Sequence, residues 1–334
     1  MPWRELADEA LVWEFVRSLA PRPGLFLQSP AWSRFQQELG NVTKVLGWFD
    51  GAQLIGLSSL SWRRLPLGWG YWCCSKGPVW QTGVTPQAQA AALLQLYTAL
   101  RAPKTLFVRL EPEFPPPAAR RTIDGEPRAT TVVDLSCSEA ELFARMHEKT
   151  RYNIRLAERK GLTFRWGDLQ EFAGFWSLLQ ETARRERFRT HNTAHYRTLL
   201  ELFGAVPFST PELACRLGLV EYQGELLAAS LVVICNRQVT YLHGASSRTH
   251  HELMAPHLLH GAALRQLQAA GCVTYDLWGI QPPDGSLSAW VGFTRFKLGF
   301  GGESVESPGT FDYPLARLSY LLYGIIRRLR RGGM

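Results

Sequence analysis

A run of cations between residues 149 and 161 is the most concentrated chemical feature of the sequence. The run ends at Gly161, and glycine is a common residue at the C-terminal end of a helix, so the pattern predicts a basic helix. A solvated basic face is one interpretation. Asn153 and Ile154 within the run favour a surface for an anionic partner instead, because a solubilising helix does not need them. The five cations are Lys149, Arg151, Arg155, Arg159 and Lys160.

A second candidate site combines a predicted strand that ends in Asp276 with a lysine among aromatic residues, Lys297, before a glycine-rich turn. Such a lysine can lie along apolar surface with its ammonium in water. It can also bind a phosphate or stabilise negative charge on a carbonyl oxygen, because a poorly hydrated ammonium attracts an anion more strongly. We also expect Tyr241 and His243, on one predicted strand, to line a cleft nearby.

The histidines and cysteines show no spacing typical of a metal site. No pair of the six cysteines has the two-residue spacer of zinc or redox motifs, so we expect reduced and mostly buried thiols. Cys73 and Cys74 should point to opposite faces of one strand. The histidines form no ligand motif either, and the sequence therefore predicts no metal centre; the residues considered are His191, His195, His243, His250, His251, His257 and His260.

Composition predicts a soluble chain of two domains. The chain has 334 residues, a net charge of +8 and a pI near 9.3, which favour an anionic partner: nucleic acid, a phosphorylated precursor or an anionic membrane surface. No stretch of about 18 apolar residues predicts a membrane span. Acidic residues precede any apolar run near the start, which is unlike a secretory signal, so we expect a cytoplasmic protein.

The elements that must position these residues occur twice. Hairpins with glycine turns are predicted around Gly51 and Gly224, about 170 residues apart, which is the length of one domain. Helices flank each hairpin and a short strand follows, and this order predicts an α+β fold with mixed sheets covered by helices. The predicted helices are 31–39, 86–100, 169–187 and 254–270, and the following strands are 105–110 and 273–277.

The domain boundary is predicted near residues 136–139, where a strand ends and Ser138 can cap the helix that Glu141 continues. The expected domains are 1–137, completed by residues 303–334, and 138–302. The tail from 313 to 331 is amphipathic and predicts a closing helix with a basic end. Such a helix could pack on the first domain or lie on the cytoplasmic face of a membrane.

Four motifs in this order resemble the Fem (FemABX) family of aminoacyl and peptidyl transferases, which extend peptidoglycan stem peptides with aminoacyl-tRNA. The motifs are Leu27–Trp32, Ser75–Val79, the basic segment with Asn153 and Ile154, and Phe296–Gly302. The resemblance covers nearly the whole chain. It implies two tandem acyl-CoA N-acyltransferase-like (GNAT) domains, the first binding the precursor, and no long coiled-coil arm, because 142–187 has no room for one.

The resemblance also implies roles for particular residues. Phe296 and Lys297 match an aromatic–lysine pair that acts near the aminoacyl ester, and Glu111 matches a proposed catalytic base, although a strand-end carboxylate can also be structural. Arg34 matches a cation that binds the precursor diphosphate, and Arg189 or His191 matches a second. The other substrate-binding residues that we expect are Trp32, Lys76, Tyr241, His243 and Asp276. The tRNA-binding residues that we expect are Lys149, Arg151, Asn153, Arg155, Arg159 and Lys160.

The implied reaction adds a small amino acid, glycine, alanine or serine, to the stem-peptide side-chain amine of a peptidoglycan precursor, forming the interpeptide bridge. Aminoacyl-tRNA is the co-substrate, no other cofactor is expected, and the precursor is nucleotide-linked or lipid-linked. An acyl-CoA-dependent N-acyltransferase is an alternative, but 246–254 lacks the glycines of a pyrophosphate loop. A non-catalytic protein that binds tRNA or anionic lipid is another.

Overall fold

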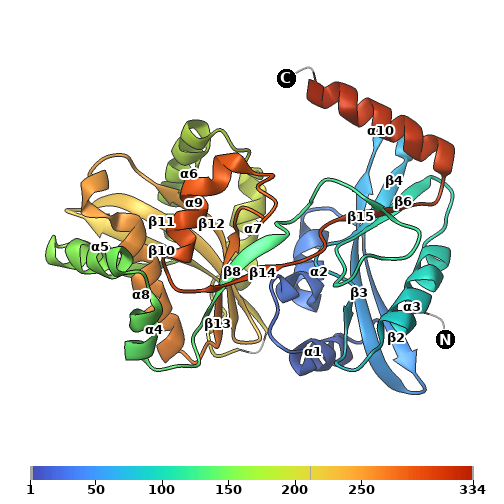
Figure 1. The fold of residues 1–334 in the computed structure, drawn as a ribbon, viewed down its shortest axis with the longest axis horizontal. Helices are drawn as coiled ribbons and strands as arrows, with labels where there is room; N and C mark the ends of the chain where they lie inside the picture. Colours follow the sequence, from blue (N-terminus) through green and yellow to red (C-terminus); the bar gives the residue numbers. More distant parts are fainter. Residues whose placement is uncertain (1–2, 211, 333–334) are drawn as a thin grey trace. The chain divides into compact units, whose positions relative to one another are not determined.

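The computed structural model describes residues 3–210 and 212–332, and the chain forms two compact units (Figure 1). Unit 1 contains the residues up to 20, Leu27–Arg128 and the residues from 307 onwards. Unit 2 contains Pro21–Phe26 and Ala129–Glu306. Each unit is built around one mixed β-sheet.

Unit 1 has an eight-stranded sheet in the order β1-β2-β3-β4-β6-β15-β7, with β5 paired to β3. Ser29 and Thr85 cap the helices α2 and α3, and a proline follows each cap, as is common in a first helical turn. The strands are β1 (Arg4–Glu5), β2 (Thr43–Asp50), β3 (Gln53–Arg64), β4 (Gly70–Cys74), β5 (Val79–Trp80), β6 (Thr105–Leu110), β7 (Arg120–Arg121) and β15 (Phe311–Pro314). The helices are α1 (Glu9–Ser18), α2 (Pro30–Glu38), α3 (Pro86–Ala99) and α10 (Arg317–Gly332).

Unit 2 has a seven-stranded sheet in the order β14-β8-β13-β12-β11-β10-β9. Ser138 and Glu141 form a reciprocal capping box at the start of α4, as the sequence predicts. The strands are β8 (Ala129–Asp134), β9 (Thr163–Gly167), β10 (Leu213–Tyr222), β11 (Glu225–Cys235), β12 (Gln238–Ser246), β13 (Thr274–Gly279) and β14 (Glu303–Glu306). The helices are α4 (Glu139–Arg145), α5 (Glu148–Arg159), α6 (Phe172–Glu186), α7 (Thr193–Phe203), α8 (Ala255–Ala269) and α9 (Val291–Leu298).

The two units repeat one order of elements. The hairpin β2–β3 is followed by β4, α3 and β6, and the hairpin β10–β11 is followed by β12, α8 and β13. The last strand of each series pairs in parallel with the strand that follows the hairpin: β6 with β4, and β13 with β12. Gly51 and Gly224 have φ values of 58° and 83° at the hairpin turns, where the sequence predicts them. The predicted duplication is therefore confirmed.

The unit boundary lies between residues 128 and 129, N-terminal to the boundary at 137/138 that the sequence predicts. The reason is the pairing of β8, which is antiparallel to both β13 and β14 in the sheet of unit 2. Strand β8 and the helix that follows it, α4, thus belong to the same unit. The sequence places β8 in the first domain because it gives no information on strand pairing.

The C-terminal segment returns to the sheet of unit 1 through β15, which pairs with β6. Asp312 accepts hydrogen bonds from Arg109 Nε at 2.7 Å and Nη2 at 2.9 Å. The side chains of this ion pair are 8% and 1% exposed. A buried bidentate pair therefore joins two strands that are about 200 residues apart.

Among the described residues the longest helix is α10, with 16 residues, and none is both long and apolar enough to cross a membrane. A long coiled-coil arm is absent from this part of the chain, as expected. The side chains of Arg328, Arg330 and Arg331, part of the predicted basic end, lie outside the described set.

Candidate active site

Lys297 is the centre of a buried polar site in unit 2. It lies in the last turn of α9 and is only 2% exposed. Its Nζ donates hydrogen bonds to the carbonyl oxygens of Trp278 at 3.1 Å and Gly279 at 2.9 Å. The rings of Phe293 and Tyr241 also face Nζ, with ring centres 3.9 Å and 5.4 Å away.

Burial lowers the pKa of Lys297 from 10.5 to about 7, against the opposing effect of the Asp276 charge. Near neutral pH the neutral amine is therefore well populated. A neutral amine has two N–H donors, and the two carbonyl groups accept from both of them. Its lone pair is then directed elsewhere and can accept a proton.

The end of β13 has an unusual backbone that supports this arrangement. Trp278 has φ at 58°, in the left-handed region that a bulky residue rarely adopts. Asp276 Oδ1 accepts from the backbone N–H of Trp278 at 2.8 Å and from the hydroxyl of Thr130. Asp276 thus fixes the turn whose carbonyl oxygen binds Lys297.

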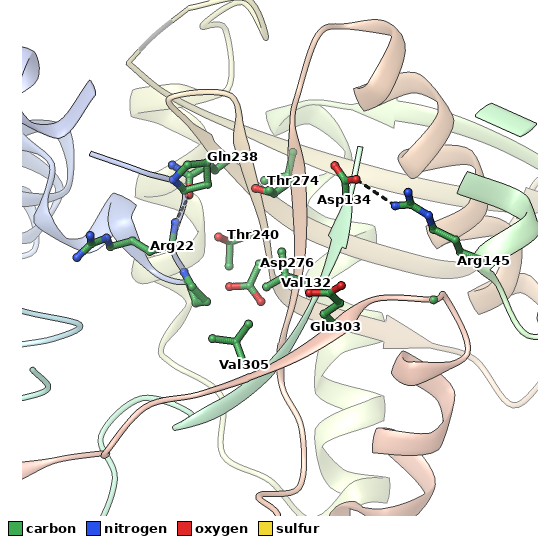
Figure 2. Close-up of a pocket in the computed structure, with 14 residues that line it drawn as sticks. Arg22, Val132, Asp134, Arg145, Gln238, Thr240, Thr274, Asp276, Glu303 and Val305 are labelled. Atoms are coloured by element: carbon green, nitrogen blue, oxygen red, sulfur yellow. Dashed lines mark hydrogen bonds and ion pairs between the residues drawn. The ribbon is translucent and has the colours of Figure 1, made fainter. Parts of the chain in front are cut away.

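Asp276 also lines a cavity of about 800 Å³ within unit 2 (Figure 2). The cavity lies against β8, β12, β13 and β14, and the segment with Arg22 closes one side by donating its N–H to Gln238 at 2.8 Å. Asp134 and Arg145 form an ion pair at 3.0 Å on its wall. The cavity is large enough for part of a small-molecule substrate.

Phe296, the aromatic residue that the sequence pairs with Lys297, packs in another direction. Its ring centre lies 5.1 Å from that of His257 and 5.6 Å from that of His260, both on α8. Burial and the charge of Lys297 lower the pKa of His260 to about 3. Phe296 therefore anchors α9 on α8, and Phe293 is the ring that faces the lysine. A helical reading of 291–298 would have found Phe293, because it lies four residues before Lys297.

Glu111 in unit 1 is 7% exposed and accepts three hydrogen bonds. Its donors are the N–H of Lys76 at 3.1 Å, the N–H of Glu126 at 2.9 Å and the hydroxyl of Thr310 at 2.8 Å. The Lys76 ammonium in turn donates to the carbonyl of Pro127. Burial and the charge of Glu111 raise the pKa of Glu126 to about 7. Glu111 thus links the end of β6 to three other segments of unit 1.

Arg34 and Trp32 both lie on α2 but face different directions. Arg34 is exposed and lines a cavity of about 230 Å³ together with Lys44 and Glu5. The Trp32 ring instead packs beside Phe35, with ring centres 4.7 Å apart. Residues two apart on a helix do not share a face, so the structure does not bring these two predicted ligands together.

The basic helix α5 divides its polar residues between two faces. Lys149, Arg155, Arg159 and Lys160 are exposed, and Tyr152 among them is 56% exposed, with the Arg159 guanidinium 5.9 Å from its ring centre. Sequence reasoning omitted Tyr152, although it lies within the cationic run.

Two residues of the cationic run 149–161, Asn153 and Arg151, make polar contacts within unit 2. Asn153 is 4% exposed, and its amide nitrogen lies 3.1 Å from His257 Nε2. Arg151 donates to the carbonyl groups of Ala144 and Met146 at the end of α4. These contacts point to structural roles for Asn153 and Arg151.

Two predicted substrate ligands, His191 and His243, lie close together near the start of α7. Their ring centres are 5.8 Å apart, and those of His191 and His195 are 3.9 Å apart. Arg189 is exposed in the preceding loop. No spacing in the sequence indicates a role for His195, because its proximity to His243 depends on the packing of α7 on the sheet.

The fold defines the class of the protein before any family is considered. A tandem GNAT protein from the clavulanic acid biosynthesis pathway superposes with a TM-score of 0.54 at 14% identity, covering 93% of this chain and 98% of that one. A crystal structure of FemX superposes with a TM-score of 0.80 at 17% identity, covering 96% and 99%. The chain thus has the expected α+β architecture of two tandem GNAT-like units.

The chain belongs to the FemAB family. The family profile matches residues 118–208 and 218–328, which is more than half of the sequence. A lipid II:glycine glycyltransferase of Staphylococcus saprophyticus is 21% identical over 260 residues, with 61% of this chain and 62% of that protein covered. The chain therefore spans somewhat less than two thirds of that relative's length.

Proposed function

We propose that this chain is a transferase that adds a small amino acid from aminoacyl-tRNA to the side-chain amine of a peptidoglycan stem peptide. Membership of the FemAB family supports the reaction class, and a relative named lipid II:glycine glycyltransferase supports the choice of precursor. The single observation that carries the mechanism is Lys297, a buried lysine with a pKa lowered to about 7 whose Nζ donates to two backbone carbonyl groups at the end of β13.

An aminoacyl ester is already activated, so the enzyme must position the acceptor amine and transfer one proton from it to the leaving oxygen. The amine nitrogen attacks the ester carbonyl carbon, a C–N bond forms, and the C–O bond to the tRNA ribose breaks. We assign Lys297 Nζ to accept the proton that the attacking nitrogen loses and to return it to the departing ribose oxygen. The carbonyl oxygens of Trp278 and Gly279 hold Nζ in place for both transfers.

The remaining residues take supporting roles in this proposal. Asp276 acts through Trp278 and is a positioning residue. Tyr241 faces the lysine from β12, and we assign it to contact the substrate. Arg34 is exposed on α2 and is available to a diphosphate. Glu111, with three hydrogen-bond donors around it, is assigned a structural role in place of a general base.

The exposed face of α5 is the proposed contact for tRNA. Four cations and the exposed ring of Tyr152 combine phosphate neutralisation with a stacking surface for a base. Glu158 on the same helix pairs with Arg265 and adds little opposing charge.

We also propose that α10 lies on an anionic membrane surface, which a lipid-linked precursor would favour. Tyr320 and Tyr323 pack on Phe107, with ring centres 5.3 Å and 5.1 Å away. The side chains of Leu318, Leu321, Leu322 and Ile325 are between 52% and 80% exposed at helical spacing. An apolar stripe next to an arginine run suits a helix lying in the plane of an anionic interface.

Vesicle sedimentation tests the membrane contact. Leu321→Ser with Ile325→Ser should reduce binding to vesicles rich in phosphatidylglycerol, while Leu67→Ser, at an 87% exposed position outside α10, should not. Equal vesicle binding by the wild type, the double variant and Leu67→Ser would refute the membrane contact. A change of oligomeric state in the double variant would assign the stripe to a second copy of the chain instead.

The donor is tested with purified protein, a precursor, tRNA, synthetases and radiolabelled amino acids. Incorporation that ribonuclease abolishes supports the proposal. Incorporation only from acyl-CoA would assign the chain to acyl-CoA-dependent acyltransferases, although 246–254 has no glycine to cradle a pyrophosphate. Binding of tRNA without any transfer would assign it to non-catalytic binding proteins.

A further inference from the structure

Three histidines that are scattered in the sequence converge in unit 2. His191 lies in the loop before α7, His195 in the first turn of α7 and His243 on β12. Within the described residues, one ligand atom from each of them lies within 4.8 Å of the other two. Rotation of the side chains alone could therefore bring three imidazole nitrogen atoms to one metal ion, with the backbone unchanged.

The backbone around these histidines is held by specific contacts. The Asn192 side chain caps α7 by accepting the His195 N–H at 3.0 Å. The hydroxyl oxygen of Tyr196, a fully buried residue, accepts the His191 N–H at 3.2 Å. The Tyr196 ring also packs edge-on against His243, with ring centres 4.9 Å apart. One buried tyrosine therefore contacts two of the three histidines.

We propose that His191, His195 and His243 bind one divalent transition-metal ion, with zinc as the best match. Zinc–nitrogen bonds of about 2.1 Å place tetrahedral ligand atoms about 3.4 Å apart, so ligand atoms within 4.8 Å of one another need to approach by at most about 1.4 Å. His191 is exposed and His195 partly so, and their side chains can rotate by this amount.

The chemistry of the three groups suits the ion. Imidazole nitrogens are good ligands for zinc, nickel and copper, and three of them leave a fourth position for water or an anionic oxygen.

The site is separate from the proposed transfer step. Lys297 and its two carbonyl partners belong to α9 and the end of β13, whereas the three histidines belong to α7, the loop before it, and β12. The proposal therefore does not rest on the proposed function, and its test needs no transfer assay.

The test is calorimetric titration of tag-free, chelator-treated full-length protein with zinc chloride, followed by cobalt(II) absorption spectra. We expect one equivalent of zinc to bind and a tetrahedral cobalt spectrum to appear. Substituting a residue that hydrogen-bonds a metal ligand lowers metal affinity by about 10- to 100-fold. Removal of a ligand itself in His195→Asn or His243→Asn should therefore lower zinc affinity by more than about 100-fold. His251→Asn, at an 82% exposed side chain outside the cluster, is the matched control.

Thermal melting without zinc establishes that each variant is folded, and zinc should raise the melting temperature of the wild type and of His251→Asn only. His195 is at the surface of α7, so His195→Asn decides the question if His243→Asn fails to fold. Absence of saturable binding by the wild type, or unchanged binding by His195→Asn, would overturn the proposal.

Discussion

Replacing Lys297 by methionine should abolish transfer and, near neutral pH, make the protein more stable. The pKa of Lys297 is about 7 when folded and 10.5 ordinarily. This difference disfavours folding by about 4 kcal/mol at pH 7, because the unfolded chain gains a proton that the folded chain binds weakly. Loss of the two hydrogen bonds to Trp278 and Gly279 costs about 1 kcal/mol each. The free energy of unfolding of Lys297→Met should therefore exceed that of the wild type by about 2 kcal/mol at pH 7.

The sign of the effect depends on pH. A lysine pKa that is lowered by folding destabilises the protein fully below the folded pKa and not at all above the unfolded one. Between pH 7 and pH 10, the free energy of unfolding of the wild type should therefore rise relative to that of Lys297→Met by up to about 1.4 kcal/mol per pH unit. The groups that face the lysine are Asp276, His260 and Tyr241; burial lowers the pKa of His260 to about 3 and raises that of Tyr241, so neither titrates in this window.

The assay is urea unfolding of both proteins at several pH values, with transfer measured on the same preparations. Lys104→Met, which removes an exposed lysine of unit 1 with no proposed role in binding, controls for the loss of one positive charge. The transfer rate of Lys297→Met should fall by about 10²-fold or more. A stability difference that does not change between pH 7 and pH 10, or a variant with wild-type transfer, would refute the reasoning.

Three further substitutions test the supporting residues. Asp312→Ala leaves Arg109 buried without its partner and should cost about 3–5 kcal/mol in urea unfolding; a cost below about 1 kcal/mol would contradict the buried pair. Glu111→Gln should cost about 1–3 kcal/mol because its amide meets N–H donors, whereas a transfer loss of about 10²-fold or more would identify a general base after all. Tyr152→Ala should weaken tRNA binding by about 1–3 kcal/mol in filter binding, and unchanged affinity would exclude stacking on α5.

Much of the fold could be predicted because the decisive signals are local. A glycine with positive φ determines each hairpin turn, and Ser138 with Glu141 determines the start of α4. The predicted helices 86–100 and 254–270 agree with α3 and α8 to within one residue at each end. Repetition of this order in the two halves was sufficient to predict the duplicated architecture.

The site could be predicted only in part because its geometry depends on contacts between distant segments. Lys297 stood out by its neighbours in the sequence, but its partners are backbone carbonyl groups of Trp278 and Gly279, which carry no sequence signal. The resemblance pairs the lysine with Phe296, its neighbour in the sequence, whereas the helical conformation of α9 brings Phe293 to face Nζ. His195 and His243 meet only because α7 packs on the sheet, which no spacing of two residues reveals.

The most direct test of the central claim is tandem mass spectrometry of the peptidoglycan precursor after incubation with the protein and charged tRNA. The account predicts a mass gain of one or more small amino acid residues, located on a stem-peptide side-chain amine and absent with Lys297→Met. No mass gain with any charged tRNA, or a residue attached elsewhere on the precursor, would contradict it.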